Sequence, residues 1–287
     1  MAIKPSDIKK EDYEKIIATS EVKGQEPVIL KMLRYIKMGY PIMLYGPAGN
    51  GKTTLAEHVL SFFGDFLKIE ATEGMTEYQL IGGFHPLALS GGKKLFKDGV
   101  VTRCLKENKN LLIDEFTRAP TSAYSGLFLL LSRGYLPLEH EEAIIKKPED
   151  WVVVATANIG DEGTFRMSSA LKRRFVPIFM DYPPASVERN VLIDRSKANE
   201  RVVNAIMKFA EETRKIAKRE TALRQGLSVD GAIKMAKYCA AAMEEGTDMK
   251  TAFLEAAFQQ ALVIGDETDD ISVNIVKEIA LRVSEEL

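Results

Sequence analysis

The sequence is poor in cysteine and lacks long apolar runs. Its 287 residues include two cysteines, Cys104 and Cys239, which lie far apart and belong to no CxxC pair. This usage indicates a reducing compartment and two ordinary buried thiols. The longest apolar stretches, such as "WVVVATA", are too short to cross a bilayer, and "MAIKPSDIKK" lacks the apolar core of a signal peptide. We therefore expect a cytoplasmic protein without a membrane span.

An excess of charge of one sign is also lacking. The chain has 39 Lys and Arg against 41 Asp and Glu, a net charge of -2. No global basic field therefore points to nucleic acid, and no acidic tail points to a solvating role. The three histidines, His58, His85 and His140, show no metal-ligand spacing. A hydrophobic content of 46% and a charged content of 28% are ordinary for a globular protein.

The first part of the chain, up to Tyr182, alternates short apolar runs with helical patterns. Their β-branched and aromatic content predicts buried strands of a parallel sheet joined by helices, which is an α/β fold. Pro177 would lose a ladder hydrogen bond in a central strand, so its strand is expected at a sheet edge. The five expected strands are residues 41–45, 66–71, 111–114, 151–157 and 176–180.

The second part of the chain is predicted to be helical. After Pro183 and Pro184 the strand signal stops, and four segments carry apolar residues at three- and four-residue spacing, with capping candidates such as Ser228 and Asp270. We expect two domains, 1–182 and 183–287. Residues 87–96, with a central Gly-Gly, suit either an inserted β-hairpin or a plain surface loop.

The stretch "YGPAGNGKTTL" carries the clearest chemistry. Gly46-x-x-x-x-Gly51-Lys52-Thr53 matches the phosphate-binding loop. It follows a predicted strand and begins a predicted helix, which is the context that this loop requires. Glycines let backbone N–H groups point inward at phosphate oxygens, and the helix N-terminus adds its dipole. Lys52 would meet the β- and γ-phosphates, and Thr53 would offer a hydroxyl to Mg²⁺.

Further candidates follow later strands. Asp114 ends an apolar strand, as a Mg²⁺-organising carboxylate should, and the adjacent Glu115 could orient or deprotonate a water. Asn158, just past another strand, could hold that water or the γ-phosphate. In "LKRRF", Arg173 and Arg174 suit either an arginine finger for a neighbouring subunit or a basic structural turn. This set favours ATP hydrolysis over transfer to a bound acceptor.

These motifs together resemble the AAA+ ATPases, and more closely their MoxR group. The resemblance runs from "EVKGQEPVI" through "YGPAGNGKTTLAEHV" and "LLIDEFTRAP" to the Asn158 segment and "ALKRRF", about residues 20 to 182. It implies a five-stranded parallel sheet in the order 5-1-4-3-2 with a helical lid, an inserted hairpin and a hexameric ring. It also implies remodelling of a protein client, often beside a partner with a von Willebrand A domain.

The resemblance implies roles for individual residues. Glu115 and Asn158 would act in catalysis, Arg174 would be the finger, and Thr53 and Asp114 would organise Mg²⁺. Arg224 would be the lid arginine, although "TALRQGLSVDG" lacks the usual motif, and "LKRRF" leaves Arg173 open as the finger. The residues that would bind ATP are Val22, Gly24, Gly46, Pro47, Ala48, Gly49, Asn50, Gly51, Lys52, Thr53, Thr54 and Arg224.

Three other functions are disfavoured by individual features of the sequence. A nucleic-acid motor is disfavoured by the net charge, and "LSRG" lacks the clamp-loader cysteine. A restriction-type GTPase is disfavoured because "NKNL" lacks the aspartate of a guanine motif. A small-molecule kinase is disfavoured by Glu115 and Asn158. Gas-vesicle assembly ATPases and rubisco activases of the related Q type share these motifs and stay open.

Overall fold

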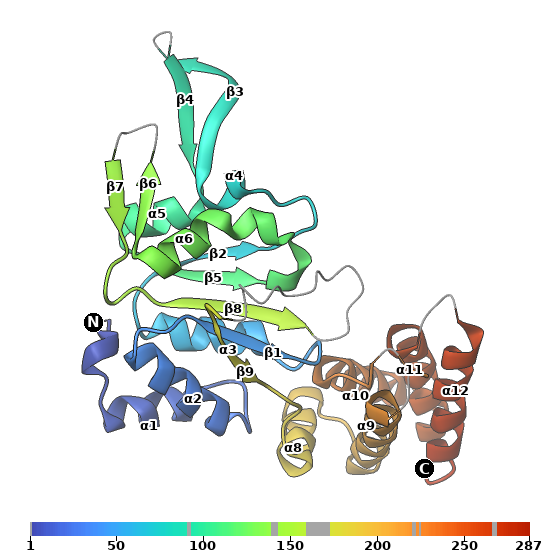
Figure 1. Ribbon diagram of the computed structural model, residues 1–287. Helices are drawn as coiled ribbons and strands as arrows, with labels where there is room; N and C mark the ends of the chain where they lie inside the picture. The colour runs from blue at the N-terminus through green and yellow to red at the C-terminus, as the bar shows by residue number, and fades with distance from the viewer. Residues whose placement is uncertain are drawn as a thin grey trace. The chain divides into compact units, whose positions relative to one another are not determined.

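The computed structural model of the protein describes residues 2–90, 93–138, 143–158, 173–219, 222–223, 225–265 and 269–287. The chain forms two compact units. Unit 1 contains Met1–Gly46 and Gly51–Met180, and unit 2 contains Pro47–Asn50 and Asp181–Leu287. Figure 1 shows that unit 1 mixes strands and helices, whereas the C-terminal residues of unit 2 are helical. The predicted boundary after Tyr182 remains our working division into domains.

A five-stranded parallel sheet forms the centre of unit 1. Its strand order is β2-β5-β8-β1-β9. When these five strands are numbered 1 to 5 along the chain, the order is 2-3-4-1-5, which read from the opposite edge is the expected 5-1-4-3-2. β1 pairs with β8 and β9 in parallel, with Ile42 opposite both Val154 and Val176. The Pro177 strand is an edge strand, as predicted. The strands are β1 (Ile42–Gly46), β2 (Phe66–Glu70), β5 (Asn110–Asp114), β8 (Val153–Asn158) and β9 (Val176–Phe179).

Helices cover both faces of this sheet because its central strands are apolar at successive positions, and successive side chains point to opposite faces. Ile42 and Leu44 of β1 point into a core with α1, α2 and α3, whereas Met43 points into the opposite core. That second core contains α5 and α6 (Figure 1). The helices are α1 (Lys10–Ala18), α2 (Glu26–Lys37), α3 (Lys52–Ser61), α4 (Glu77–Leu80), α5 (Val100–Glu107) and α6 (Ser125–Arg133). Short 3-10 turns are η1 (Pro5–Asp7), η2 (Phe116–Arg118) and η3 (Thr121–Tyr124).

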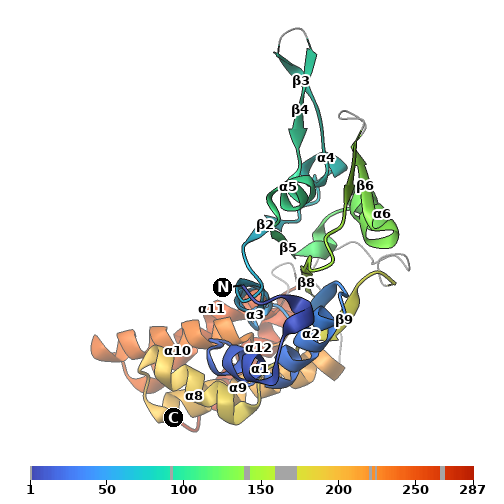
Figure 2. The same cartoon turned by 90° about the vertical axis from the view of Figure 1, so that its left-hand side faces the viewer.

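Two antiparallel hairpins project from unit 1 (Figures 1 and 2). β3 (Gly82–Ser90) pairs with β4 (Lys93–Asp98), so the hairpin reading of residues 87–96 is correct and the hairpin is longer than expected. Its Gly91-Gly92 turn lies outside the described residues. β6 (Tyr135–Leu138) pairs with β7 (Ala143–Lys146), a hairpin that the sequence did not predict.

Unit 2 is built from helices around one apolar core that contains Phe209 and Phe253, whose rings meet edge to face at 6.1 Å. Ser228 caps a helix as predicted, since its side chain accepts from the Gly231 N–H. The predicted cap Asp270 is wrong by one residue: the Asp269 carboxylate accepts from the first N–H groups of the last helix. The helices are α8 (Ala185–Ser196), α9 (Glu200–Arg219), α10 (Val229–Glu244), α11 (Met249–Ile264) and α12 (Asp270–Ser284). Among them, α8 was not predicted.

Candidate nucleotide site

The glycine-rich loop has the backbone that its sequence predicts. Gly49 and Gly51 have φ of +66° and +88°, in the left-handed region that glycine adopts without steric cost. α3 begins at Lys52, directly after Gly51. The Lys52 side chain is buried, and its Nζ donates to the carbonyl oxygen of Gly46 at 3.2 Å. A loop of this kind offers inward N–H groups and one positive charge to a phosphate chain.

Val22 lies against this loop. A Cβ atom built on Gly51 would come within 3.4 Å of both Cγ atoms of Val22, so the segment before α2 approaches the start of α3. Gly24 has a positive φ of +76°. Val22 and Gly24 therefore belong to a turn beside the start of α3, and Val22 offers an apolar surface beside the loop.

Asp114 is the centre of a hydrogen-bond cluster at the end of β5. Its Oδ1 accepts from Thr53 Oγ1 at 2.7 Å and from Thr156 Oγ1 at 2.5 Å. Burial by itself would raise the pKa of Asp114, but hydrogen bonds from Thr156, Thr53 and Lys68 outweigh it and hold that pKa below its usual range. The carboxylate is therefore ionised and oriented near the first turn of α3.

Lys68 of β2 bridges two carboxylates. Its Nζ lies 3.1 Å from Asp114 Oδ2 and 2.9 Å from Glu57 Oε1 of α3. Burial lowers the pKa of Lys68, yet the hydrogen bonds to Glu57 and Asp114 raise it above its usual value overall. The ammonium group is therefore charged at neutral pH and faces the carboxylate oxygen that the two threonines leave uncovered.

Glu115 adopts a strained backbone beside this cluster. Its φ is +53°, which is uncommon for a residue other than glycine, and its N–H donates to Thr156 Oγ1 at 3.1 Å. Asn158 Nδ2 donates to both carboxylate oxygens of Glu115, at 2.9 and 3.0 Å. Arg118 Nε lies 3.4 Å from Glu115 Oε2. Backbone strain of this kind concentrates at functional sites, and here the strained residue is the one whose carboxylate contacts Asn158 and Arg118.

The remaining predicted site residues are more scattered. Arg174 is half-buried and its side chain packs against α6, where Nε donates to Ser132 Oγ at 2.8 Å and the guanidinium lies 5.3 Å from the Phe128 ring centre. Arg173 is exposed. Thr54 is exposed on α3, and Asn50 is buried. Arg224 lies outside the described residues. Pro47, Ala48, Gly49 and Asn50 belong to unit 2.

The donor set around Asp114 suits magnesium. Mg²⁺ prefers hydroxyl, carboxylate and water oxygens, and the Thr53 hydroxyl and the Asp114 carboxylate provide two such groups side by side. The described residues contain no cluster of three or more His, Cys, Asp or Glu that could hold a metal ion by themselves. A metal at this position would therefore take its other ligands from nucleotide phosphates and water, as is usual for Mg²⁺.

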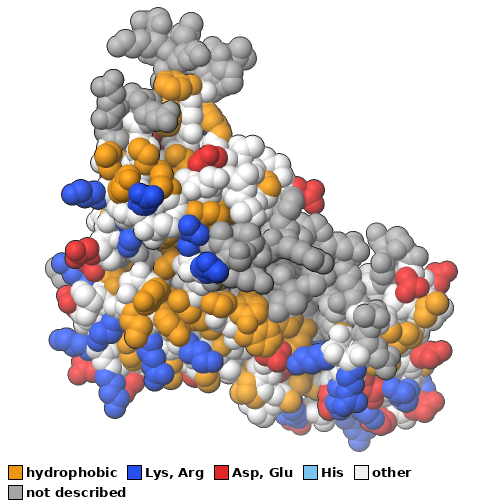
Figure 3. Space-filling view, in the orientation of Figure 1, with side chains coloured by type: hydrophobic (Ala, Val, Ile, Leu, Met, Phe, Trp, Pro, Cys, Tyr) orange, Lys and Arg blue, Asp and Glu red, His pale blue; other side chains and the backbone are white. Residues whose placement is uncertain are grey.

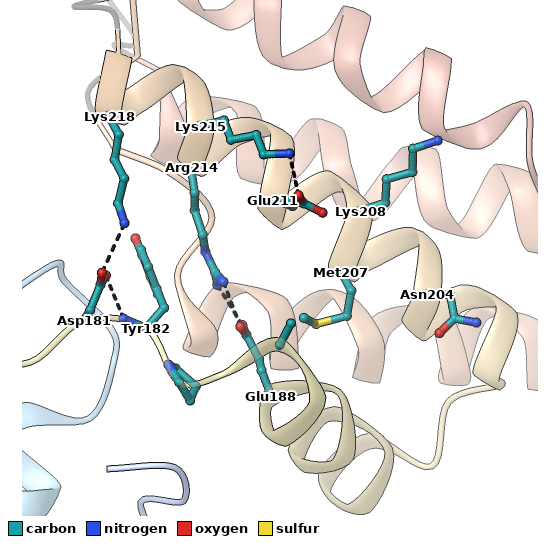
Figure 4. Close-up of a pocket in the computed structure, with 12 residues that line it drawn as sticks. Asp181, Tyr182, Glu188, Asn204, Met207, Lys208, Glu211, Arg214, Lys215 and Lys218 are labelled. Carbon is teal, nitrogen blue, oxygen red and sulfur yellow. Dashed lines mark hydrogen bonds and ion pairs between the residues drawn. The ribbon is translucent and has the colours of Figure 1, made fainter. Parts of the chain in front are cut away.

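Unit 2 contains a pocket of its own, of about 490 Å³, between α8, α9 and the segment that precedes α8 (Figure 4). Arg214 forms a two-pronged ion pair with the fully buried Glu188, at 2.7 Å for each contact. The Arg214 guanidinium also lies 3.7 Å from the centre of the Tyr182 ring. This cluster ties α8 and α9 to the segment that precedes α8, and the paired charge of Arg214 explains why a carboxylate can be buried there.

Three residues of the Asp114 cluster were missed by the sequence analysis. Thr156 has a detectable signal, because it is a hydroxyl residue inside an otherwise apolar strand. Lys68 has a weaker signal, as a charge in a short strand, and Glu57 has none beyond its place on α3. Their roles depend on which strands are neighbours.

The distribution of surface charge and the composition of the helices bear on possible nucleic-acid and membrane contacts. Figure 3 shows Lys and Arg interspersed with Asp and Glu on the described part of the visible face. Among the helices that the structure describes, none combines the length and the apolar character that a bilayer crossing requires.

Comparison with known proteins agrees with this geometry. A family profile described as the AAA domain of the dynein-related subfamily matches residues 41–175. A Staphylococcus epidermidis protein, named only as uncharacterized, is 30% identical over 202 residues, covering 68% of this chain and 76% of that protein. A similarly named Staphylococcus aureus protein is 29% identical over 193 residues, covering 66% and 73%.

A solved structure shares the fold. The protein, from Cytophaga hutchinsonii and named as a candidate ATPase, has a TM-score of 0.50 and 21% identity, covering 95% of this chain and 93% of that one. The phosphate-binding loop, the Asp114 cluster and the sheet order all occur within or beside the matched segment. The chain therefore belongs to the dynein-related subfamily of AAA domains, and it is an ATPase, as its motifs predicted.

Proposed function

We propose that this ATPase is a ring protein of the MoxR kind that hydrolyses Mg²⁺-bound ATP to remodel or mature a protein complex. The observation that carries the proposal is the pairing of Glu115 with Asn158 beside the Thr53–Asp114 contact. Glu115 and its amide partner Asn158 lie next to Asp114, a separate carboxylate that could help to bind Mg²⁺. This arrangement suits hydrolysis better than transfer to a bound acceptor, because Glu115 can act on a water.

The residues divide the chemistry among them. Thr53 and Asp114 would hold Mg²⁺, which when bound neutralises part of the phosphate charge. Lys52 and the N–H groups of the loop bind the phosphates. Glu115 orients an attacking water and accepts its proton, and Asn158 keeps the Glu115 carboxylate in place through its two hydrogen bonds. Proton acceptance by a positioned carboxylate contributes about 10²–10⁴ in rate.

Ring assembly is part of the proposal. An arginine from "LKRRF" would reach the γ-phosphate of the next subunit and offset charge on its equatorial oxygens. Arg174, held on α6 by Ser132 and Phe128, has a defined starting position, and Arg173 is the exposed alternative. The client is a protein, and a partner with a von Willebrand A domain fits the group that the motifs resemble.

Replacing Glu115 tests the assignment. Glu115→Gln keeps the shape of the side chain and one acceptor oxygen for Asn158, so Mg²⁺ and ATP should bind with wild-type affinity in calorimetry. Hydrolysis should fall about 10²-fold or more, because an amide accepts no proton. Glu107→Gln is the matched control: Glu107 is partly exposed and pairs with Lys109 at 2.8 Å, so its loss should leave both measurements unchanged.

The same variant can reveal the client. Glu115→Gln should accumulate the ATP-bound ring, and affinity capture in ATP should enrich proteins that the Lys52→Ala variant does not retain. Near-normal turnover by Glu115→Gln would refute the assignment of the base. Competition by GTP as strong as by unlabelled ATP would instead favour a GTPase.

A further inference from the structure

Lys68 occupies an unexpected place beside the proposed magnesium site. β2 and β5 pair in parallel, with Lys68 opposite Leu112 and Glu70 opposite Asp114. Alternate residues of a strand share one face, so Lys68 is on the same face as Asp114. Leu112 packs into the core that contains α3, which places the Lys68 side chain beside that helix and within reach of Glu57.

The contacts of Asp114 divide between its two oxygens. Oδ1 accepts from the hydroxyl groups of Thr53 and Thr156, whereas Oδ2 faces the Lys68 ammonium at 3.1 Å. The Asp114 side chain is 12% exposed and that of Lys68 is 39% exposed. Lys68 is therefore the positively charged partner of Asp114 Oδ2, and its side chain is exposed enough to move into solvent.

A lysine ammonium and Mg²⁺ cannot both stay close to the same carboxylate without cost. They carry one and two positive charges, and their repulsion at a separation of a few ångströms is large even in a partly solvated site. Mg²⁺ also requires near-ideal octahedral geometry with its waters retained, which leaves little room for an ammonium group at Asp114 Oδ2.

Glu57 offers Lys68 another partner. The Lys68 Nζ to Glu57 Oε1 distance is 2.9 Å, shorter than its distance to Asp114. Lys68 can therefore leave Asp114 and keep one charge-assisted hydrogen bond to α3. Without Glu57, the ammonium would have only the Asp114 carboxylate to bond with in this cluster.

From this geometry we propose that Lys68 is a positioning residue that competes with Mg²⁺ for Asp114. In the metal-free state it orients the carboxylate, and in the metal-bound state it moves onto Glu57. This inference rests on the proposed function, because it requires Mg²⁺ to bind at Thr53 and Asp114. Glu57 then favours the metal-bound state and Lys68 opposes it. Replacing Lys68 should therefore strengthen Mg²⁺ binding, and replacing Glu57 should weaken it.

The test measures binding of the non-hydrolysable ATP analogue AMP-PNP by calorimetry, once in Mg²⁺ and once in EDTA. The ratio of the two dissociation constants, EDTA over Mg²⁺, reports how strongly the metal supports binding. Lys68→Met should raise this ratio about three- to tenfold, since the competing charge is gone. Glu57→Gln should lower it about two- to threefold, since Lys68 then bonds more firmly to Asp114.

Two controls accompany these variants. Lys68→Arg keeps the positive charge and should leave the ratio near that of the wild type. Lys106→Met removes another partly exposed lysine of unit 1, on α5, whose Nζ lies 3.0 Å from Asp98 Oδ2. This variant should leave the ratio unchanged. Thermal unfolding should stay within a few degrees of the wild type for every variant, because these side chains are exposed or half-buried.

The outcomes separate the inference from the proposed function. If the wild-type ratio is one, the magnesium site of the proposed function is wrong. If the wild-type ratio exceeds one but Lys68→Met leaves it unchanged or lowers it, the competition is refuted. A shift of Lys68→Met and Glu57→Gln in the same direction would also refute it, because a purely structural ion pair predicts equal signs.

Discussion

The Nδ2 atom of Asn158 lies 2.9 Å from Oε1 and 3.0 Å from Oε2 of Glu115, so one amide group holds both oxygens of one carboxylate. The two residues end neighbouring strands of the sheet, with Glu115 directly after β5 and Asn158 at the last position of β8. This contact links the residue proposed to accept a proton with the residue expected to hold the attacking water or the γ-phosphate. It provides the first prediction.

Asn158→Ala should slow hydrolysis without weakening nucleotide binding. Without the amide, the Glu115 carboxylate loses its two hydrogen bonds and its orientation toward a water, and misplacement of a catalytic group can cost about 10²-fold in rate. We expect kcat to fall about 10- to 100-fold. The Kd for Mg²⁺ and AMP-PNP should stay within about twofold in calorimetry if Asn158 acts on the water through Glu115 rather than on the γ-phosphate. A loss confined to Kd would assign Asn158 to binding instead.

Lys52→Ala should weaken ATP binding about tenfold or more, because a charge-assisted contact with a phosphate contributes about 1.5–3 kcal/mol. Lys52 is buried, and its Nζ bonds with the Gly46 carbonyl, so the shorter side chain also leaves space below the loop. Lys52→Met fills that space and should show the same loss. Unchanged affinity in both variants would remove the loop from the nucleotide site.

Subunit mixing should reveal a shared site. Arg174→Ala and Glu115→Gln should each be inactive, since arginine fingers contribute about 10³–10⁵ in rate. A mixed ring contains interfaces in which an intact Glu115 meets an intact Arg174, so activity should return after exchange. Mixing Arg173→Ala with Glu115→Gln tests the neighbouring arginine. If labelled subunits exchange and neither mixture regains activity, "LKRRF" is a structural turn.

Arg214→Met should destabilise unit 2. The change leaves the Glu188 carboxylate buried without its partner, which costs about 3–5 kcal/mol. Urea unfolding followed by the helical circular dichroism signal should show the loss. Arg189→Met is the control, because Arg189 forms a solvent-exposed pair with Glu200 at 2.9 Å, for which about 0–1 kcal/mol is expected. Equal losses in the two variants would contradict this account.

Both thiols should be inert in the folded protein. Burial raises the pKa of Cys104 to about 12 and that of Cys239 to about 12, so the thiolate fraction at pH 8 is about 10⁻⁴. Ellman's reagent should therefore label neither cysteine within minutes at pH 8 and label both in guanidinium chloride. Because the thiolate is the reactive form, labelling should become faster as the pH rises toward these raised pKa values. Rapid labelling of the native protein at pH 8 would show that the core around Cys104 or the core around Cys239 opens readily.

Local sequence determined much of unit 1. The five predicted strands appear within two residues of their expected ends, because short β-branched runs flanked by turn residues have few alternatives. The phosphate-binding loop needs positive φ at Gly49 and Gly51, and only glycine adopts such angles easily. Pro177 removed a ladder donor and so predicted its own place at the sheet edge.

Other features could not be predicted because their signals are weak or non-local. The hairpin β6–β7 is short, its connection lies outside the described residues, and neighbouring charged residues hid the strand pattern. α8 has apolar residues at irregular spacing and is stabilised by the buried Glu188, whose partner Arg214 comes 26 positions later. The cap of α12 at Asp269 rather than Asp270 depends on which carboxylate the backbone turns toward the N–H groups.

Sequence alone therefore determined the chemistry that depends on neighbours in the chain: the loop, the Asp114–Glu115 pair and the apolar periods of the helices. Tertiary structure decided which of these groups meet. Lys68 comes 46 residues before Asp114, and Asn158 follows Glu115 by 43 residues. Such pairs form only because β5 lies between β2 and β8, an order set by the packing of helices on both faces of the sheet. The sheet order, rather than any single motif, thus places a competing lysine beside the metal-type carboxylate and an amide beside the proposed base.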